Sequence, residues 1–475
     1  MCQVYINGKW IETSQKEVII NPATEEEVGE VYVGGQKEAE EAIQAARHAF
    51  KSWRMLSGND RGKILVKIAN EIMKVQSQIA ETITKEMGKP ITDARREVAS
   101  AAAYLEWYGE EAKRVYGDVL PALDTKKQLM VLRQPVGVIG AITPWNFPVS
   151  MITRKLGPAL AAGCTAVLKP APSTPACAME VFKCFERGGL PQGVANLVIG
   201  DADSIGSEMT SNSIVKKITF TGSTKVGKLL MRNAAENVQK VSMELGGHAP
   251  FIVFEDANLD DAVASVIGTK FKNAGQTCIS TNRIYVQESI KDEFSNRLAR
   301  EVHTLKVGNG MEEDIEMGPL INAAALEKVE DQVTKATESG ASVVTGGSRI
   351  KGTKGYFYAP TVLADTTDDM KIAKEETFGP VAPIFTFRTE NEVIDRANNT
   401  PYGLMSYCFT NDLSRSIRMM HQLDYGMVGI NDPAPIVPHA PFGGMKESGI
   451  GREGGTSGLY EFMEEKFVSI RTAEK

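Results

Sequence analysis

The residue with the clearest chemical potential in this chain is Cys278, in the segment FKNAGQTCIS. It lies between a predicted helix and a predicted strand, where Gly275 lets the backbone approach a ligand closely. A thiolate in such a loop can attack an electrophilic carbon. A single cysteine taken alone is more often an inert part of a core. Cys278 is therefore a candidate nucleophile whose role depends on the residues around it.

Three further polar residues follow predicted strands. Glu244, in VSMELGGHAP, has apolar surroundings that favour a general base, although a surface ion pair is the alternative. Lys169, in TAVLKPAPSTP, could hold a ribose hydroxyl or a phosphate, or could simply be a solvated lysine. Asn146, in PWNFP, could donate to a developing oxyanion together with the backbone N–H of Cys278. Otherwise it only caps the helix that Pro148 begins.

The segment TFTGSTKVGK has the pattern of a phosphate-binding turn between a strand and a helix. Gly222 suits the tight turn, Ser223 offers a hydroxyl donor, and Gly227 allows close packing of the helix. The pattern departs from the G-x-G-x-x-G fingerprint, so a plain helix cap is the alternative.

The elements that must position these residues follow from hydrophobic periodicity. Residues 38–117 have the spacing of helices. From 165 to 247 short apolar strands alternate with helices, which predicts a mostly parallel sheet with ligands at its carboxyl edge. A second alternating region from 249 to about 430 predicts a second α/β lobe. Gly246 and Gly247 are the expected hinge.

Composition excludes several classes of protein. The 475 residues are 42% hydrophobic and 24% charged, which predicts a globular chain of two or three lobes. A net charge of -7 with dispersed Lys and Arg predicts no nucleic-acid partner. No signal or membrane-spanning stretch is expected, and six cysteines without a C-x-x-C pair favour reduced thiols, so we expect a cytoplasmic protein. The five histidines lack metal-ligand spacing, so no catalytic metal is predicted.

Seven ordered segments resemble those of the aldehyde dehydrogenase superfamily, and the resemblance covers essentially the whole chain. They are PWNFP (144–148), VLKPAPSTP (167–175), FTGSTKVG (220–227), MELGGHAP (243–250), GQTC (275–278), EETFGPV (375–381) and PFGGMKESGIGRE (441–453).

The resemblance implies an α/β fold with three parts and a homodimer or homotetramer. A Rossmann-like dinucleotide-binding lobe would span 1–117 and 136–247, and a catalytic lobe 248–446. A small β oligomerisation flap would combine 118–135 with 455–475.

The resemblance also implies site roles: Cys278 as nucleophile, Asn146 as oxyanion donor and Glu244 as general base, with Lys169 counted among the catalytic residues. An aldehyde would form a thiohemiacetal, lose hydride to NAD or NADP, and leave as an acid after hydrolysis of a thioester. The expected cofactor-binding residues are Trp145, Asn146, Lys169, Pro172, Ser173, Gly222, Ser223, Gly227, Leu245, Glu376 and Phe378.

The expected substrate is succinate semialdehyde, because NFPVSMITRKLGPALAAG and the close of the chain resemble succinate-semialdehyde dehydrogenases. There, the arginine matching Arg154 binds the distal carboxylate. A second family arginine is Lys272 here, and the serine expected near the tail falls in the apolar stretch 435–437. The segment MGPLINAAALEKVEDQV is similar to lactaldehyde dehydrogenases, so a small hydroxyaldehyde is the alternative.

The residue at position 172 bears on the choice between NAD and NADP. NAD-preferring relatives usually carry a glutamate where Pro172 stands, so NADP should be tolerated or preferred near Lys169 and Ser173. Ser280 occupies the position of a second cysteine found in some relatives, so no redox disulfide is expected there.

A nitrilase-type amidase could use the same Cys, Glu and Lys, but it would leave FTGSTKVG and EETFGPV unexplained. A relative that has lost catalysis is disfavoured because Cys278, Glu244 and Asn146 are all present.

Overall fold

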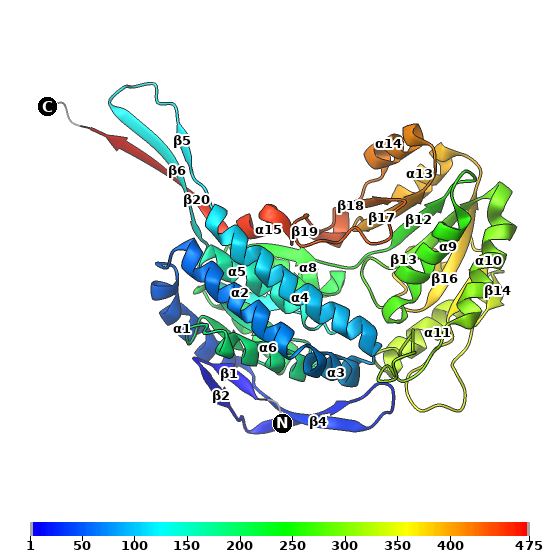
Figure 1. Cartoon of the computed structure of the whole chain (residues 1–475), viewed down its shortest axis with the longest axis horizontal. Coiled ribbons are helices and arrows are strands. Elements are labelled where there is room, and N and C mark those ends of the chain that lie inside the picture. Colours follow the sequence, from blue (N-terminus) through cyan, green and yellow to red (C-terminus); the bar gives the residue numbers. More distant parts are fainter. Residues whose placement is uncertain (1–2, 473–475) are drawn as a thin grey trace.

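The computed structural model describes residues 3–472, which form two lobes built on sheets and a projecting β arm (Figure 1). Buried apolar side chains form one large core in the first lobe and two adjoining cores in the second. Cys2 lies outside the described residues, as do the extreme ends of the predicted domain ranges.

The first lobe is built on a sheet of eight strands among the described residues, in the order β19, β11, β10, β7, β8, β9, β1, β2. The inner strands β7 to β11 run parallel, while β1 and β2 at one edge and β19 at the other pair antiparallel. Strands β7 and β8 are buried throughout, because helices cover both faces. The strands are β1 (Val4–Ile6), β2 (Lys9–Ile11), β7 (Val138–Ile142), β8 (Thr165–Lys169), β9 (Ala195–Leu197), β10 (Val215–Thr221), β11 (Lys240–Glu244) and β19 (Gly449–Ile450).

The strand order creates a crevice at the carboxyl edge of this sheet. The chain runs from β7 to β8 and β9 on one side, then returns to β10 and β11 on the other, and ligands of such sheets bind where the order reverses. The register pairs Ile142 with Lys169, and Thr221 with Glu244. The predicted Rossmann-like sheet is confirmed, and two candidate site residues, Lys169 and Glu244, end strands β8 and β11 at the same edge, with β7 and β10 between them.

The helices of the first lobe pack around this sheet, with α4 lying against both α2 and α5. Helix α5 begins at Ser150, two residues later than the first turn expected at Pro148. Its first N–H groups are capped by Glu97 of α4. The helices are α1 (Gln36–Trp53), α2 (Gly58–Lys74), α3 (Gln76–Met87), α4 (Ile91–Glu111), α5 (Ser150–Ala162), α6 (Pro175–Arg187), α7 (Ala202–Ser211), α8 (Thr224–Ala235) and α15 (Gly455–Tyr460).

The second lobe has a sheet of seven strands among the described residues, in the order β14, β15, β16, β13, β12, β17, β18. All neighbouring pairs are parallel except β14 with β15, which confirms the predicted second α/β lobe. Its strands are β12 (Ala249–Val253), β13 (Thr281–Gln287), β14 (Ser342–Thr345), β15 (Thr361–Ala364), β16 (Val381–Phe387), β17 (Met405–Phe409) and β18 (Met427–Ile430). Its helices are α9 (Leu259–Val266), α10 (Lys291–Thr304), α11 (Ala323–Glu338), α12 (Lys371–Lys374), α13 (Glu390–Asn398) and α14 (Leu413–Gln422).

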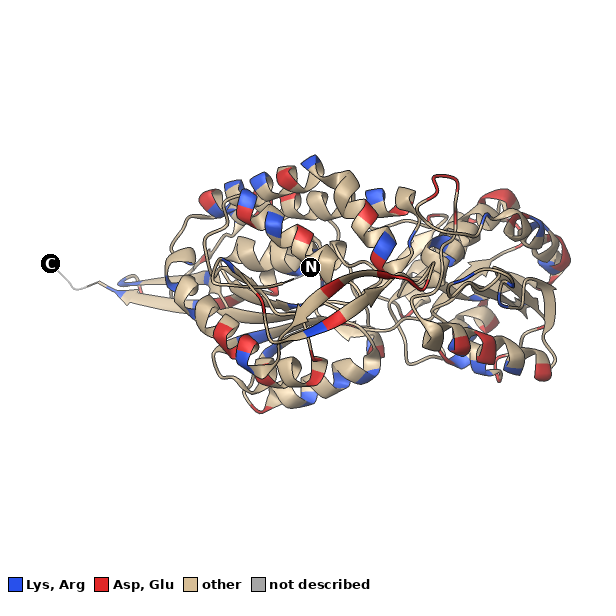
Figure 2. Ribbon diagram, turned by 90° about the horizontal axis from the view of Figure 1, so that it is seen from below, with Lys and Arg blue, Asp and Glu red and all other residues tan. Residues whose placement is uncertain are grey.

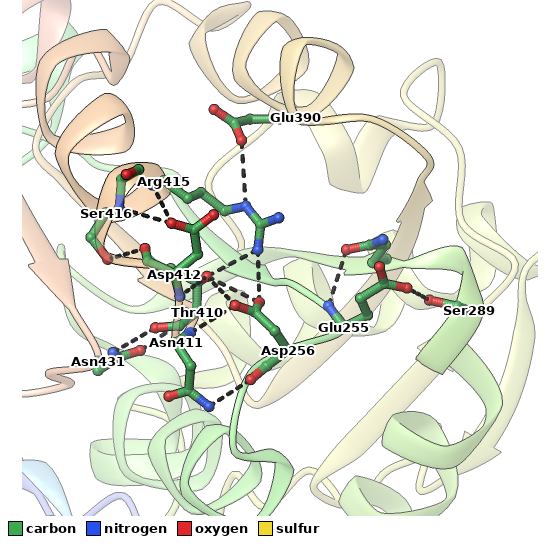
Figure 3. A network of polar contacts seen from close by, with 12 residues as sticks. Glu255, Asp256, Ser289, Glu390, Thr410, Asn411, Asp412, Arg415, Ser416 and Asn431 are labelled. Atoms are coloured by element: carbon green, nitrogen blue, oxygen red, sulfur yellow. Dashed lines mark hydrogen bonds and ion pairs between the residues drawn. The ribbon is translucent and has the colours of Figure 1, made fainter.

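A polar network holds the carboxyl edge of the second sheet together (Figure 3). Asp256, after β12, accepts hydrogen bonds from the Thr410 hydroxyl, from the Asn411 backbone and, at 2.7 Å, from Nη1 of Arg415. Arg415 also donates to Glu390 at the start of α13. The network ties two parallel strands to α13 and α14 at the edge opposite the one where β13 begins.

The arm is a three-stranded sheet in the order β20, β6, β5, and it projects from the first lobe (Figure 1). Strand β20 (Met463–Arg471) pairs antiparallel with β6 (Lys127–Pro135) along its whole length, and β5 (Asp118–Leu120) lies on the other side of β6. The short helix α15 that precedes β20 packs against α5 rather than joining the arm.

Strands β3 (Gln15–Ile20) and β4 (Glu27–Val33) form a separate hairpin. Acidic and basic residues alternate over the outer helices without gathering into one field (Figure 2). None of the helices in residues 3–472 is both long and apolar enough to cross a membrane.

Candidate active site

The loop that carries Cys278 is pressed against the connection between the two sheets. Before it, Asn273 and Ala274 adopt left-handed backbone conformations, with φ of 52° and 53°. A Cβ atom on Gly247 would lie 2.1 Å from the carbonyl oxygen of Cys278, so only glycine allows this approach. The segment that follows Glu244 therefore passes directly beside the candidate nucleophile.

Cys278 lines a cavity of about 280 Å³ between the two lobes, together with both predicted substrate-binding residues, Arg154 and Lys272. Apolar walls come from Phe147, Phe442 and others, and Ile436 from the apolar stretch noted in the sequence also contributes. The charged side chains of the lining are four basic and two acidic: Lys89, Arg96, Arg154 and Lys272 against Asp93 and Glu97. The cavity is therefore suited to an anionic ligand.

Arg154 is held rigidly in this cavity. The residue is only 5% exposed. Its Nη2 donates to the Tyr104 hydroxyl at 2.9 Å, and its guanidinium lies over the Phe442 ring, 4.3 Å from the ring centroid. Nη1 is 3.8 Å from Oε2 of Glu453, which is too long for a hydrogen bond. A fixed guanidinium with incomplete pairing is a good anchor for a carboxylate.

The environment of Cys278 disfavours its thiolate in the resting state. Burial, then the Glu376 and Glu244 carboxylates, raise the pKa of the thiol to about 12, and Arg154 opposes this shift. A neutral thiol needs a nearby base before it can attack a carbonyl carbon.

Glu244 has the environment of such a base. It is 4% exposed, and its Oε2 has no hydrogen-bond partner among the described residues. Burial, and then the negative charge of Glu453, raise its pKa well above the ordinary carboxyl value, while Lys155 and Arg154 oppose the rise. Glu453 itself accepts a hydrogen bond of 2.7 Å from Lys155. Glu244 does not line the cavity, but its negative charge contributes to the raised pKa of Cys278.

Asn146 is fixed by contacts on both its side chain and its backbone. Its Nδ2 donates to the carbonyl of Gln276 at 3.0 Å, in the same loop as Cys278. Its carbonyl accepts from Nζ of Lys89 at 2.9 Å and from Asn273. The side-chain amide has a second N–H that these bonds leave for an oxyanion.

Lys89 and Glu97 form a buried ion pair that the sequence analysis did not identify. Besides holding Lys89, Glu97 accepts N–H bonds from Val149 at 2.9 Å and Ser150 at 3.2 Å, and so caps α5 from a different helix. Only the side-by-side packing of α4 and α5 reveals this role. No local pattern in the sequence signals it.

Two charged groups near the carboxyl edge of the first sheet suit a dinucleotide: the buried Lys169, and the half-buried Glu376 of the second lobe. Lys169 is buried, donates to the Pro170 carbonyl at 3.2 Å, and has its pKa lowered to about 8 by burial. Its remaining N–H groups could serve hydroxyls or phosphate. Glu376 accepts from the Gly247 N–H at 2.9 Å, and burial raises its pKa to about 7. Trp145 lies nearly perpendicular to the ring of Phe378, with their centroids 5.7 Å apart.

The predicted phosphate turn is built as a helix start. The Ser223 hydroxyl accepts the Val226 N–H at 3.3 Å, so in this structure it caps α8. A Cβ on Gly227 would lie 2.3 Å from the Leu245 side chain, which is the close helix packing expected of this glycine. At Gly222, a Cβ would lie 2.4 Å from the Phe220 ring. Of the two residues considered for cofactor preference, Pro172 is exposed and Ser173 half-buried.

Known proteins are similar to this chain along nearly its whole length. A model of the aldehyde dehydrogenase family matches residues 10–468. Glutarate-semialdehyde dehydrogenase of Pseudomonas putida is 48% identical over 470 residues, covering 98% of this chain and 97% of that protein. Succinate-semialdehyde dehydrogenase [NADP(+)] of Escherichia coli is 47% identical, with the same coverage. The crystal structure of betaine aldehyde dehydrogenase from Staphylococcus aureus in complex with NAD+ is 36% identical, has a TM-score of 0.97, and covers 100% of this chain and 95% of its own.

Proposed function

This chain belongs to the aldehyde dehydrogenase family, and we propose that its substrate is an aldehyde with a carboxylate at its far end, foremost succinate semialdehyde. As a member of that family, it is an enzyme that oxidises aldehydes to carboxylic acids with NAD or NADP. The single observation that carries the substrate proposal is that Arg154, buried and incompletely paired, lines the same cavity as Cys278.

The proposed chemistry begins at Cys278. Its sulfur attacks the aldehyde carbon after the thiol proton passes to Glu244, whose raised pKa suits it to accept a proton. The Asn146 amide and the Cys278 backbone N–H stabilise the oxyanion of the thiohemiacetal. Loss of hydride gives a thioester. Glu244 first releases the thiol proton to solvent. It then takes a proton from water, the hydroxyl adds to the thioester carbon, and the acid leaves as the Cys278 sulfur is released.

The proposed cofactor site lies at the carboxyl edge of the first sheet. A bound nicotinamide dinucleotide supplies the hydride acceptor. Lys169 would bind ribose hydroxyls or a phosphate, and Glu376 would accept from a second ribose. The other predicted contacts are Trp145, Asn146, Pro172, Ser173, Gly222, Ser223, Gly227, Leu245 and Phe378. We propose a preference for NADP, because a buried lysine and no carboxylate at Pro172 favour a 2'-phosphate.

We also propose that the chain forms a homo-oligomer through the arm and works in the cytoplasm. The arm exposes apolar side chains, including Val119 and Phe467, that a second copy of the chain could cover, so we propose a homodimer or homotetramer. The described cysteines are free thiols, which suits the reducing cytoplasm. The three proposed parts are the dinucleotide-binding lobe, the catalytic lobe and the oligomerisation arm.

One other substrate has a specific observation in its favour. Glutarate semialdehyde also ends in a carboxylate, is one methylene longer, and is the substrate named for a relative at 48% identity. Lactaldehyde is disfavoured, since a neutral hydroxyaldehyde would leave the cationic cavity without a counter-charge.

The test compares initial rates of cofactor reduction for succinate semialdehyde, glutarate semialdehyde, lactaldehyde and propanal, each with NAD and NADP. We expect the two carboxylate aldehydes to have the highest kcat/KM, and Arg154→Gln to remove that advantage by roughly 10- to 100-fold, the value of a charged hydrogen bond. Equal loss for all four aldehydes, or a wild-type preference for lactaldehyde, would refute the substrate assignment.

A further inference from the structure

Arg96 is a second guanidinium at the cavity that holds Cys278, and the proposed mechanism does not use it. It lies in the first turns of α4, and its side chain lines the cavity with Arg154 and Lys272 while remaining 73% exposed. Its Nη1 donates to Oδ1 of Asp93 at 3.1 Å. Among the described residues it has no other hydrogen-bond partner, so most of its N–H groups are available to a ligand.

Asp93 faces two cations from different elements. Its side chain is only 9% exposed, and Nζ of Lys272, which follows the π-helical turn Ile267–Phe271, lies 3.7 Å from the same Oδ1 that Arg96 contacts. One negative charge therefore holds a guanidinium and an ammonium together at the rim of the cavity. A carboxylate from a ligand would supply the missing counter-charge. Lys89, the remaining basic residue of the lining besides Arg154, is already neutralised by Glu97.

We propose that Arg96 supplies the second guanidinium that binds the distal carboxylate of the substrate, with Asp93 as the residue that positions it. Lys272 can offer a carboxylate only a point charge, whereas the planar fork of an arginine can bind both oxygens at once. Arg96 therefore performs, from α4, the bidentate recognition that Lys272 cannot. The inference rests on the proposed function, because it assumes a substrate that ends in a carboxylate.

The competing explanation is an ordinary ion pair between Arg96 and Asp93 one helical turn apart. Exposed pairs of that kind contribute little and have no effect on ligands. The position of Asp93 argues otherwise, because its buried carboxylate lines the cavity and is shared with Lys272.

The chain offers a matched control for Arg96 in its neighbour, Arg95. Arg95 makes two hydrogen bonds to Glu313, of 2.8 and 3.0 Å, and does not line the cavity. Arg95→Gln and Arg96→Gln thus make the same change in charge on adjacent residues of one helix. Only one of them touches the cavity.

The experiment measures the ratio of kcat/KM for succinate semialdehyde to that for propanal, and the inhibition constant of succinate, for the wild type and both variants. We expect Arg96→Gln to lower the ratio about ten-fold and to raise the inhibition constant similarly, while Arg95→Gln leaves both at wild-type values. Arg96→Lys should recover only part of the loss, and Lys272→Arg added to Arg96→Gln should restore most of it.

The outcomes separate this inference from the proposed function. If Arg96→Gln behaves like Arg95→Gln while Arg154→Gln still abolishes the preference for succinate semialdehyde, Arg96 is an ordinary surface residue and the proposed function stands. If neither Arg96→Gln nor Arg154→Gln alters the ratio, both assignments are wrong. Because Arg96 is mostly exposed, the variants should fold, and a thermal melt that matches the wild type confirms that each can be interpreted.

Discussion

At the scale of single residues, burial controls the protonation of the two candidate catalytic groups, the Cys278 thiol and the Glu244 carboxyl. Cys278 and Glu244 are both shifted toward their neutral forms, because burial disfavours both charges and the Glu244 carboxylate further raises the pKa of Cys278. A neutral pair avoids two repelling charges in a confined space. Proton transfer from Cys278 can generate the nucleophile only when Glu244 is ionised, so the site does not maintain a free thiolate exposed to oxidants.

These shifts predict that turnover rises with pH. A carboxyl group whose pKa is raised is protonated below that pKa and cannot act as a base, and the thiolate fraction of Cys278 also grows as pH approaches about 12. We expect kcat with succinate semialdehyde to increase from about pH 6 to about pH 9, where unshifted carboxyls are already fully ionised. Stopped-flow and steady-state assays across this range measure the effect.

The matched variant for this prediction is Glu244→Gln, which removes the base while preserving shape. It should lower kcat by roughly 10²- to 10⁴-fold, because both the Cys278 thiol and the hydrolytic water lose their base. A wild-type profile that is flat or falls with pH, or a Glu244→Gln enzyme that turns over normally, would show that another group is the base.

At the scale of elements, one helix positions the oxyanion residue through another. Helix α5 lacks a capping side chain of its own, and Glu97 of α4 binds its first two free N–H groups. The partner of Glu97, Lys89, in turn binds the carbonyl of Asn146. The packing of α4 against α5 therefore sets the orientation of the turn that carries Asn146.

Glu97→Gln should both destabilise the protein and slow its chemistry. The change leaves the Lys89 ammonium buried without a counter-charge, which typically costs about 3–5 kcal/mol in the free energy of unfolding. Urea denaturation followed by tryptophan fluorescence measures this loss. Glu313→Gln, which breaks an exposed pair with Arg95, should cost less than about 1 kcal/mol. Similar losses for the two variants would show that the buried pair has no special role.

The same elements show what could be predicted from the sequence. Lys169 and Glu244 were placed correctly at strand ends because a buried strand and the residue that ends it are adjacent in the chain. The bond from Val149 to Glu97 spans 52 residues, and the pair of Lys155 with Glu453 spans 298, so no local pattern reveals them. Ser223 shows a different limit: its strand–helix position was right, but no local pattern showed that its hydroxyl oxygen also accepts the Val226 N–H to cap α8, a bond that leaves its O–H free to donate. The assigned site roles stay predictions until the variants are measured.

At the scale of the whole molecule, the arm is notable for the apolar side chains that it exposes to solvent. It stands away from the first lobe and carries the described end of the chain along β20 (Figure 1). Its strands expose Val119, Leu132, Phe467 and Ile470 to solvent. Such an apolar β surface is an aggregation hazard unless another chain covers it.

We therefore expect Phe467→Asp to weaken the assembly. Phe467 is 61% exposed in the single chain, and covering such a side chain is worth about 1.5–3 kcal/mol, counted once for each copy in a symmetric interface. Sedimentation velocity at micromolar concentration should show the variant as a smaller species than the wild type. The matched control is Lys466→Glu, which makes a larger change in charge on the exposed residue next to it in β20 without removing apolar area. If both variants dissociate equally, charge rather than apolar burial holds the copies together, and if neither does, the arm is not the principal contact.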